Sequence, residues 1–289
     1  MNYKKSILFA ATLLFSLNLH AFTDSDLDGV DDSVDKCPNT PFMDIVDLNG
    51  CTKKSLLKTT TSKQSNHHYD FIIGASYSGT DYNQLNRSDT AATSLQVDYY
   101  YKDLSIQAST SYYYSKDTSG RTNNGFYDTF VGASYKIQAT KDLKFYVGAG
   151  ALLPTYDTSL NNNNTDYKAS ASFSYYLSKV NIFGGYSYTQ VNDDDVVIRN
   201  SDGSRTYYNY QNTNSFNGGI GVYATNRLYL SASYFEGDSI YVGYEKIKSA
   251  SLYGYYTIDK NWFTTFSYAR GLSDTATDNY ASIRLGYFF

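Results

Sequence analysis

The 289-residue chain is poor in several residue types: it has three Pro, two Cys, three His and one Trp. After the first 21 residues it also lacks any run of ~18 consecutive apolar residues, the length that a membrane-spanning helix requires. A helical membrane protein is therefore excluded. The net charge of −4 and the absence of a basic stripe argue against nucleic acid as a partner.

The shortage of histidine also argues against an enzyme. Beyond the first 21 residues only His67 and His68 remain, and no Ser or Asp motif surrounds them. A side-chain nucleophile needs a positioned base beside it. We therefore expect no catalytic residues, and we assign both histidines to a linker or to an aromatic girdle.

Tyrosine and alternating patterns are abundant instead. The chain has 33 Tyr and 16 Phe, although its mean hydropathy is only −0.46. Near the end of the chain, apolar or aromatic residues at odd positions alternate with polar or small ones at even positions, which is typical of a strand with one buried face. The odd residues are Ala281, Ile283, Leu285, Tyr287 and Phe289, and the even ones are Ser282, Arg284 and Gly286. Tyr has an apolar ring and a polar hydroxyl, so it suits the interfacial girdles of a membrane barrel.

Twelve such runs are predicted after residue 68, each near the ~9–11 residues that a tilted membrane strand needs. They are 69–79, 91–101, 104–115, 126–137, 142–154, 167–177, 180–190, 215–225, 227–236, 248–258, 261–270 and 279–289. Residues 238–244, which precede the tenth run, can also form strand pairs and would then extend that hairpin above the membrane. Connections alternate between short and long, as expected of periplasmic turns and outer loops.

The last strand, which ends on Phe289, resembles the closing strand of bacterial outer-membrane β-barrels. The resemblance implies an all-β fold, a transmembrane antiparallel barrel of 12 strands over residues 69–289. It also implies a Gram-negative outer membrane, contact with its lipid, and both barrel termini in the periplasm. The rival is a secreted β-sandwich. The terminal Phe, the turn asymmetry and the abundant Tyr count against that rival.

The start of the chain is typical of an exported protein. Lys4 and Lys5 form a basic segment, and residues 6–19 form an apolar segment too short to span a membrane comfortably. We expect a signal peptide over residues 1–21, cleaved after Ala21. Phe22 follows instead of Cys, which argues against a lipoprotein anchor.

An acidic segment that begins at Asp24 has the spacing of an EF-hand-type calcium loop. Gly29, at position 6, allows the sharp turn. The predicted ligands, at positions 1, 3, 5, 7, 9 and 12, are Asp24, Asp26, Asp28, Val30 through its carbonyl, Asp32 and Asp35. Asp at position 12 has a shorter reach than Glu, so we expect weaker binding than in cytosolic buffers. The alternative is a solvated acidic linker that binds nothing firmly.

The pattern D-x-D-x-D-G-x-x-D-x-x-D-x-C-P resembles a thrombospondin type 3 repeat, as in the linkers of the outer-membrane protein A family. The resemblance covers residues 24–51 and implies a bound Ca²⁺ and a Cys37–Cys51 disulfide. We assign residues 22–52 to this repeat, in the periplasm, and residues 53–68 to a flexible linker. That family's peptidoglycan-binding domain is not evident. A periplasmic envelope protein is therefore an alternative partner.

The inner face of the predicted strands is rich in Ser and Gly, which leaves space for water in a barrel wider than eight strands. The predicted inward charges are Asp70, Asp98, Asp128, Lys136, Lys144, Lys168 and Arg284. Strands one and twelve must be neighbours, so Arg284 can pair with an acid such as Asp98. These charges are either structural pairs or a selectivity filter.

Inward tyrosines are also predicted, and they either pack the wall or stack on flat solutes. They are Tyr100, Tyr113, Tyr146, Tyr176, Tyr223, Tyr229, Tyr253 and Tyr255. The long segment 191–214 either constricts the lumen, binds a cation through Asp193 to Asp195, or is a solvated loop. The sequence thus favours a porin-like channel for small solutes. The alternative is a plugged structural or surface-interaction barrel.

Overall fold

The computed structural model describes residues 67–82, 86–155, 163–199 and 203–289. The predicted signal peptide, the calcium-loop ligands from Asp24 to Asp35, the Cys37–Cys51 disulfide and most of the 53–68 linker lie outside these residues. Within them, no helix is long and apolar enough to cross a membrane.

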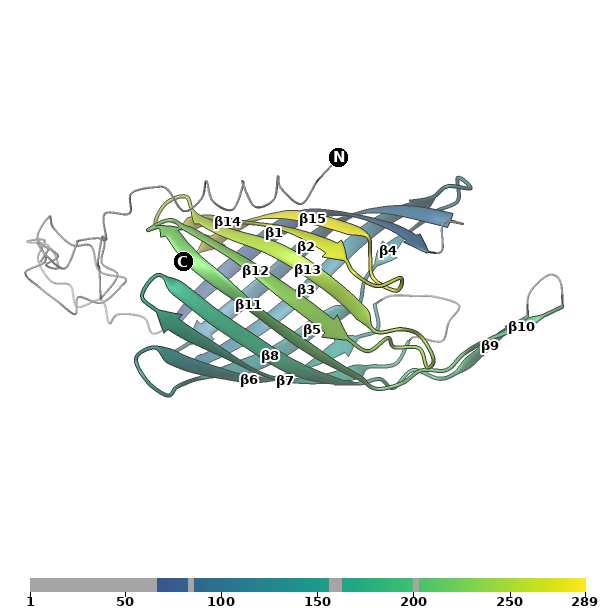
Figure 1. Cartoon of the computed structure of the whole chain (residues 1–289), viewed down its shortest axis with the longest axis horizontal. Helices are drawn as coiled ribbons and strands as arrows, with labels where there is room; N and C mark the ends of the chain where they lie inside the picture. The colour runs from purple at the N-terminus through teal and green to yellow at the C-terminus, as the bar shows by residue number, and fades with distance from the viewer. Residues whose placement is uncertain (1–66, 83–85, 156–162, 200–202) are drawn as a thin grey trace, which may run out of the picture. The chain divides into compact units, whose positions relative to one another are not determined.

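The described residues form one large antiparallel sheet and a separate hairpin (Figure 1). The strands are β1 (His67–Tyr82), β2 (Asn86–Tyr101), β3 (Leu104–Asp117), β4 (Thr122–Phe126), β5 (Thr129–Gln138), β6 (Leu143–Leu153), β7 (Asp166–Leu177), β8 (Val180–Gln190), β9 (Val196–Arg199), β10 (Arg205–Tyr208), β11 (Thr213–Thr225), β12 (Leu228–Gly237), β13 (Ile247–Thr257), β14 (Trp262–Gly271) and β15 (Asn279–Phe288).

Because β1 pairs with both β15 and β2, and β2 also pairs with β3, the large sheet closes into a 12-strand barrel. Closure leaves no free sheet edge. A free edge would expose unpaired backbone amides and carbonyls to lipid, where nothing can bond to them. The all-β class and the twelve predicted runs are confirmed. The run predicted at 180–190 coincides with β8 residue for residue.

Several boundaries differ from the sequence prediction. β1 begins at His67, so the linker predicted to reach residue 68 ends before the two histidines. β2 begins at Asn86, five residues before the predicted run. The fourth run corresponds to β5, and β4 precedes it in a segment predicted as a loop; both strands pair with β3. Segment 191–214 contains a hairpin, β9–β10, that the sequence analysis did not predict.

The outer face of the barrel carries aliphatic side chains at mid-height and aromatic ones near both ends. β1 illustrates the order: Tyr69 and Phe71, then Ile73, then Tyr77 all point outward and are exposed. Ile73 has 61% of its surface exposed and Leu252 has 60%. Exposing this much apolar surface to water would be unfavourable in hydrophobic free energy. This exterior suits lipid and confirms the sequence prediction of two aromatic girdles.

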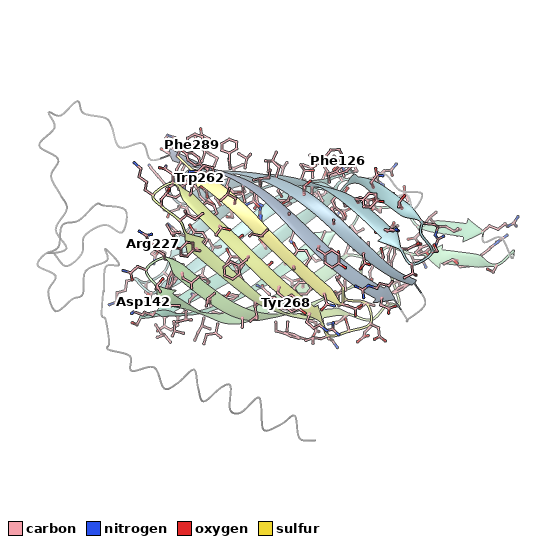
Figure 2. The ribbon with its side chains drawn as sticks, turned by 90° about the horizontal axis from the view of Figure 1, so that it is seen from above. Phe126, Asp142, Arg227, Trp262, Tyr268 and Phe289 are labelled. Carbon is pink, nitrogen blue, oxygen red and sulfur yellow. The ribbon has the colours of Figure 1, made fainter. Side chains whose placement is uncertain are left out.

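The two ends of the barrel differ in their connections. At one end, here called the turn end, short connections follow β2, β5, β7, β11 and β13. Figure 2 places Asp142, Arg227, Trp262 and Phe289 together at this end. Lys102 and Ser178, in two of the three two-residue turns, have φ of 54° and 56°, the left-handed conformation that tight hairpins use. The opposite end, the loop end, carries the longer connections and the β9–β10 hairpin.

The chain's last residue takes part in closing the barrel. The Phe289 amide donates to the Tyr69 carbonyl at 3.1 Å, and the Tyr69 amide donates to the Phe289 carbonyl at 3.0 Å. The Phe289 ring stacks on Tyr69 and Phe71 with centroids 5.6 Å away in both cases. The terminal Phe therefore closes the ladder between the first and last strands.

Candidate functional site: the barrel lumen

The inner wall of the barrel is built from hydroxyl groups. Serines that face each other across neighbouring strands are hydrogen-bonded in pairs at 2.7–2.8 Å: Ser105–Ser134, Ser187–Ser215, Ser233–Ser251 and Ser267–Ser282. A Ser hydroxyl has one donor and two acceptor sites, so each pair keeps unused capacity. The wall is therefore polar and built of small side chains, and its hydroxyl groups can bind water or solute.

A cavity of about 630 Å³ lies within this wall. Its lining includes Ser172, Ser231, Ser251, Asn217 and Tyr253. Among the described residues, none that lines it is Asp, Glu, Lys, Arg or His. The space predicted inside the barrel is thus present, and the described residues that line it carry no charge.

Tyrosines form a belt around the lumen on the side of the turn end. Its members are Tyr100, Tyr146, Tyr176, Tyr223, Tyr229, Tyr253 and Tyr255, all predicted from the sequence to point inward. The rings of Tyr223 and Tyr229 have centroids 5.0 Å apart. The eighth predicted residue, Tyr113, lies nearer the loop end, where it is 5% exposed and packs on Tyr127.

Tyr229 is held in one orientation by its neighbours. Its hydroxyl donates to Asn181 Oδ1 at 3.0 Å, and Asn181 Nδ2 donates to Ser174 Oγ at 2.7 Å. Gly221 permits this close approach, because a Cβ there would lie 2.1 Å from the Tyr229 hydroxyl. The Tyr229 ring therefore lies against the wall over Gly221.

Arg284 and Asp98 are linked across the seam where the barrel closes. Arg284 Nη2 donates to Gln96 Oε1, and Gln96 Nε2 donates to Asp98 Oδ2 at 2.7 Å. The sequence predicted a pair between Arg284 and Asp98. The structure brings the two together but places the Gln96 amide between them. Gln96 was missed because residue spacing does not reveal cross-strand register.

Gly74 explains how Arg284 reaches past β1. It is directly opposite Arg284 on one side and Ser94 on the other. A Cβ on Gly74 would lie 2.7 Å from both Arg284 Cγ and Ser94 Oγ. The missing side chain is thus the space through which Arg284 extends from β15 to β2.

The other predicted inward charges do not gather into one filter. Lys136 forms an ion pair of 3.0 Å with Asp103 in a turn. The Lys144 ammonium lies 4.9 Å from the Tyr176 ring centroid, a cation–π distance. Lys168 lies on β7 opposite Gly150 and Thr189, apart from Lys136 and Lys144. Structural pairing thus accounts for most of these charges.

Two further predicted charges and both histidines lie near the ends of the barrel. Asp70 is opposite Asp98 in the β1–β2 ladder, and Asp128 lies between β4 and β5. The His67 ring stacks on Tyr101 at 4.7 Å, and the His68 ring stacks on Tyr100 at 4.3 Å. His67 therefore belongs to the outer aromatic girdle, as one interpretation predicted, whereas His68 stacks on a tyrosine of the lumen belt.

At the loop end, acidic residues hold the base of the β9–β10 hairpin. Asp193 Oδ1 accepts the Asn164 amide at 3.2 Å, and Asp195 Oδ1 accepts the Tyr210 amide at 2.8 Å. Burial is the main cause that raises the pKa of Asp193. Within the described residues, no group of three His, Cys, Asp or Glu is placed to hold a metal ion. The hairpin extends beyond the barrel (Figure 1), so it does not constrict the lumen as one prediction had it.

Another acid at the loop end, Asp238, joins the end of β12 to the start of β11. Asp238 Oδ2 accepts hydrogen bonds from the Asn214 backbone amide at 2.9 Å and its side-chain amide at 3.0 Å. These bonds stabilise the carboxylate and lower the pKa of Asp238. The stabilisation is present above the ordinary Asp pKa and is lost as pH falls through the lowered value. The loop end is therefore braced at neutral pH.

Comparison with solved structures identifies the fold. An outer-membrane channel from Pseudomonas putida F1 aligns with 77% of this chain and 95% of its own, with a TM-score of 0.63 at 10% identity. The NanC porin (75% and 97% covered, 13% identity) has a TM-score of 0.49. The translocator domain of the autotransporter NalP from Neisseria meningitidis (79% and 90% covered, 11% identity) has a TM-score of 0.47.

No family model matches the chain, and no curated protein matches its sequence. The likeness to the Pseudomonas channel therefore rests on structure, and at 10% identity it shows the fold alone. That fold is the outer-membrane type of β-barrel, in agreement with the sequence prediction. Function must be argued from the lumen.

Proposed function

We propose that the protein is a porin-like channel for small solutes in the outer membrane of a Gram-negative cell. The observation that carries the proposal is the neutral, hydroxyl-lined cavity of about 630 Å³ inside a closed barrel. Small side chains leave a 12-strand lumen incompletely filled. The apolar exterior places the barrel in lipid, and polar outer loops at one end match the outer-membrane arrangement.

The positions of the two histidines argue against an enzymatic role. His67 packs on Tyr101 and His68 on Tyr100 of the lumen belt, both at the turn end, and neither lines the cavity. A nucleophile among the cavity-lining residues would have neither as its base. We therefore assign the protein no enzymatic role.

A structural or surface-interaction role is the second candidate. The β9–β10 hairpin extends beyond the barrel and exposes 52% of Val197 and 59% of Tyr207. Such side chains on a projecting hairpin suit contact with another molecule. This role does not exclude transport, because the hairpin leaves the cavity open.

Single-channel recording with a matched pair of variants tests the transport role. Ser251 lines the cavity, whereas the preceding residue, Ala250, is exposed on the outer face and is not among the lining residues. We expect Ser251→Trp to reduce conductance severalfold, because its ring occupies the lumen. Ala250→Trp should leave conductance within experimental error. Equal conductance in both variants would contradict a conduction path through this cavity.

We also infer that the N-terminal segment binds calcium through the ligands Asp24 to Asp35. The support is the complete ligand spacing and its Gly29 turn. Calorimetric titration of the mature protein should show heat for one Ca²⁺ per chain, lost in Asp28→Asn. Asp274→Asn, in an outer loop, is the matched control and should bind as the parent does. A parent protein without calcium heat would contradict the inference.

The location of this segment and its covalent link remain part of the same proposal. We propose that residues 22–52 lie in the periplasm and that Cys37 and Cys51 form a disulfide. Two Cys in an exported chain favour this bond over a zinc site. A bound calcium would then brace the segment or present it to a periplasmic envelope protein.

A further inference from the structure

We propose that the channel selects neutral, polyhydroxylated solutes, namely short sugar oligomers, and binds them at the Tyr229 side of the cavity. The inference rests on the proposed channel function and names its substrate class. Its first support is the hydroxyl wall. Ser233–Ser251 and Ser267–Ser282 lie on adjacent strand pairs around the cavity, and each hydroxyl can both donate and accept. Sugar hydroxyls have the same dual capacity.

The second support is the charge distribution. Among the described residues, the cavity lining carries no Asp, Glu, Lys, Arg or His. Two of the nearby charges are engaged: Arg284 bonds through Gln96 to Asp98, although its buried Nε has no hydrogen-bond partner in the described part of the chain, and Lys136 pairs with Asp103. An ionic solute would lose hydration on entry without gaining a counter-charge. A neutral solute has no such penalty.

The third support is the presence of aromatic rings within the same cavity. Tyr146, Tyr229 and Tyr253 line it together with the serines. Tyr229 is fixed by its bond to Asn181 and by contact with Gly221, so only one face of its ring remains toward the lumen. A fixed aromatic face packs well on the apolar face of a sugar ring. Purely apolar solutes fit less well, since the hydroxyl groups around them would lose their water.

The fourth support is size. A volume of about 630 Å³ is within the range of ~300–1,000 Å³ typical of sites for small molecules. The cavity can therefore hold a solute of more than one sugar unit while part of the lumen stays wet. A cavity of this size, with rings on one side and hydroxyls around it, matches a flat polyol.

The test is current block in a planar bilayer, with maltotriose as the probe. We expect maltotriose to interrupt the open-channel current in a concentration-dependent way. A polyethylene glycol of equal hydrodynamic radius should give shorter interruptions, because it has no sugar ring to pack on Tyr229. Trigalacturonate, the charged trimer, should block more weakly than maltotriose. The protein is refolded in an amine-oxide detergent, since sugar-headed detergents would compete.

Variants on one strand identify the ring. Tyr229→Ala should weaken maltotriose block about 2- to 12-fold, the range expected for loss of one ring contact. Tyr229→Phe should retain most of the block. Tyr234→Ala is the control, because Tyr234 lies on the same strand but faces outward, 44% exposed. Tyr253→Ala is measured as well, because Tyr253 also lines the cavity, and it carries the test alone if Tyr229→Ala does not fold.

The outcomes separate the two proposals. Conductance with equal block by maltotriose and polyethylene glycol, or tighter block by trigalacturonate, would overturn the sugar inference and leave the channel function standing. A folded barrel with no conductance would overturn the channel function itself. Maltotriose block that survives both tyrosine variants would overturn the assignment of the binding surface.

Discussion

Ile283→Arg is expected to reduce the free energy of unfolding in a bilayer by about 2–4 kcal/mol, the cost of a charged side chain on the lipid face at mid-membrane. Ile283 lies mid-strand in β15, is 61% exposed, and is opposite Ala75 on β1 and Phe266 on β14. Urea unfolding of the barrel in lipid vesicles, followed by tryptophan fluorescence, gives the difference.

Its control is the neighbouring residue on the same strand. Ser282 points into the lumen and pairs with Ser267 at 2.7 Å. Ser282→Arg loses one neutral hydrogen bond, about 0.5–1.5 kcal/mol, and its guanidinium reaches lumen water. Equal losses for the two variants, or a larger loss for Ser282→Arg, would contradict the assignment of a lipid face to Ile283.

Gly74→Ala is expected to destabilise the barrel by about 1–3 kcal/mol, as overpacking does. The new Cβ would meet Arg284 Cγ and Ser94 Oγ at 2.7 Å, so Arg284 must leave Gln96. Gly218→Ala is the matched control: its Cβ would find its nearest neighbour, the Phe183 carbonyl oxygen, at 3.8 Å. Ala in a strand is otherwise more stable than Gly, so the control should be neutral or slightly stabilised. The same urea unfolding in vesicles measures both.

A double-mutant cycle shows whether Arg284 is the cause. In the Arg284→Ala background the guanidinium and its Cγ contact are gone. Gly74→Ala should then cost clearly less than it does in the parent, with a coupling of about 1 kcal/mol or more. Additive effects would mean that Gly74 does not serve the passage of Arg284 across the seam.

Much of the fold was predictable because a barrel strand repeats a simple physical pattern. Alternation alone located all twelve spanning strands, and it reproduced β8 at both ends. The β9–β10 hairpin was missed although its signal is present: two short β-prone runs around Asp202-Gly203. The boundary between linker and barrel at His67 was also missed, because His-His has no alternation of its own.

The site was predictable in composition but not in contacts. Period-two alternation identified the inward Ser, Gly and Tyr residues, and the closure of strand twelve on strand one placed Arg284 near Asp98. The role of Gly74, and the position of Gln96 between the two charges, depend on strand register. Register is set by many cross-strand pairs at once, so a single strand's sequence does not reveal it.

The support from Asn181 shows the same limit. Asn181 is 4% exposed and bonds to Tyr229, 48 residues away in sequence. β12, which carries Tyr229, is separated from β8 by β11 in the sheet. A contact across an intervening strand needs Gly221 in between, and only the folded barrel brings these three together.

Single-channel recording of the refolded mature protein in a planar bilayer, with calcium present, tests the central claim most directly. The account predicts discrete, reproducible conductance steps from a barrel shown to be folded by its heat-modifiable gel mobility. A folded barrel that stays silent across repeated insertions would contradict it and would favour the structural or surface-interaction role.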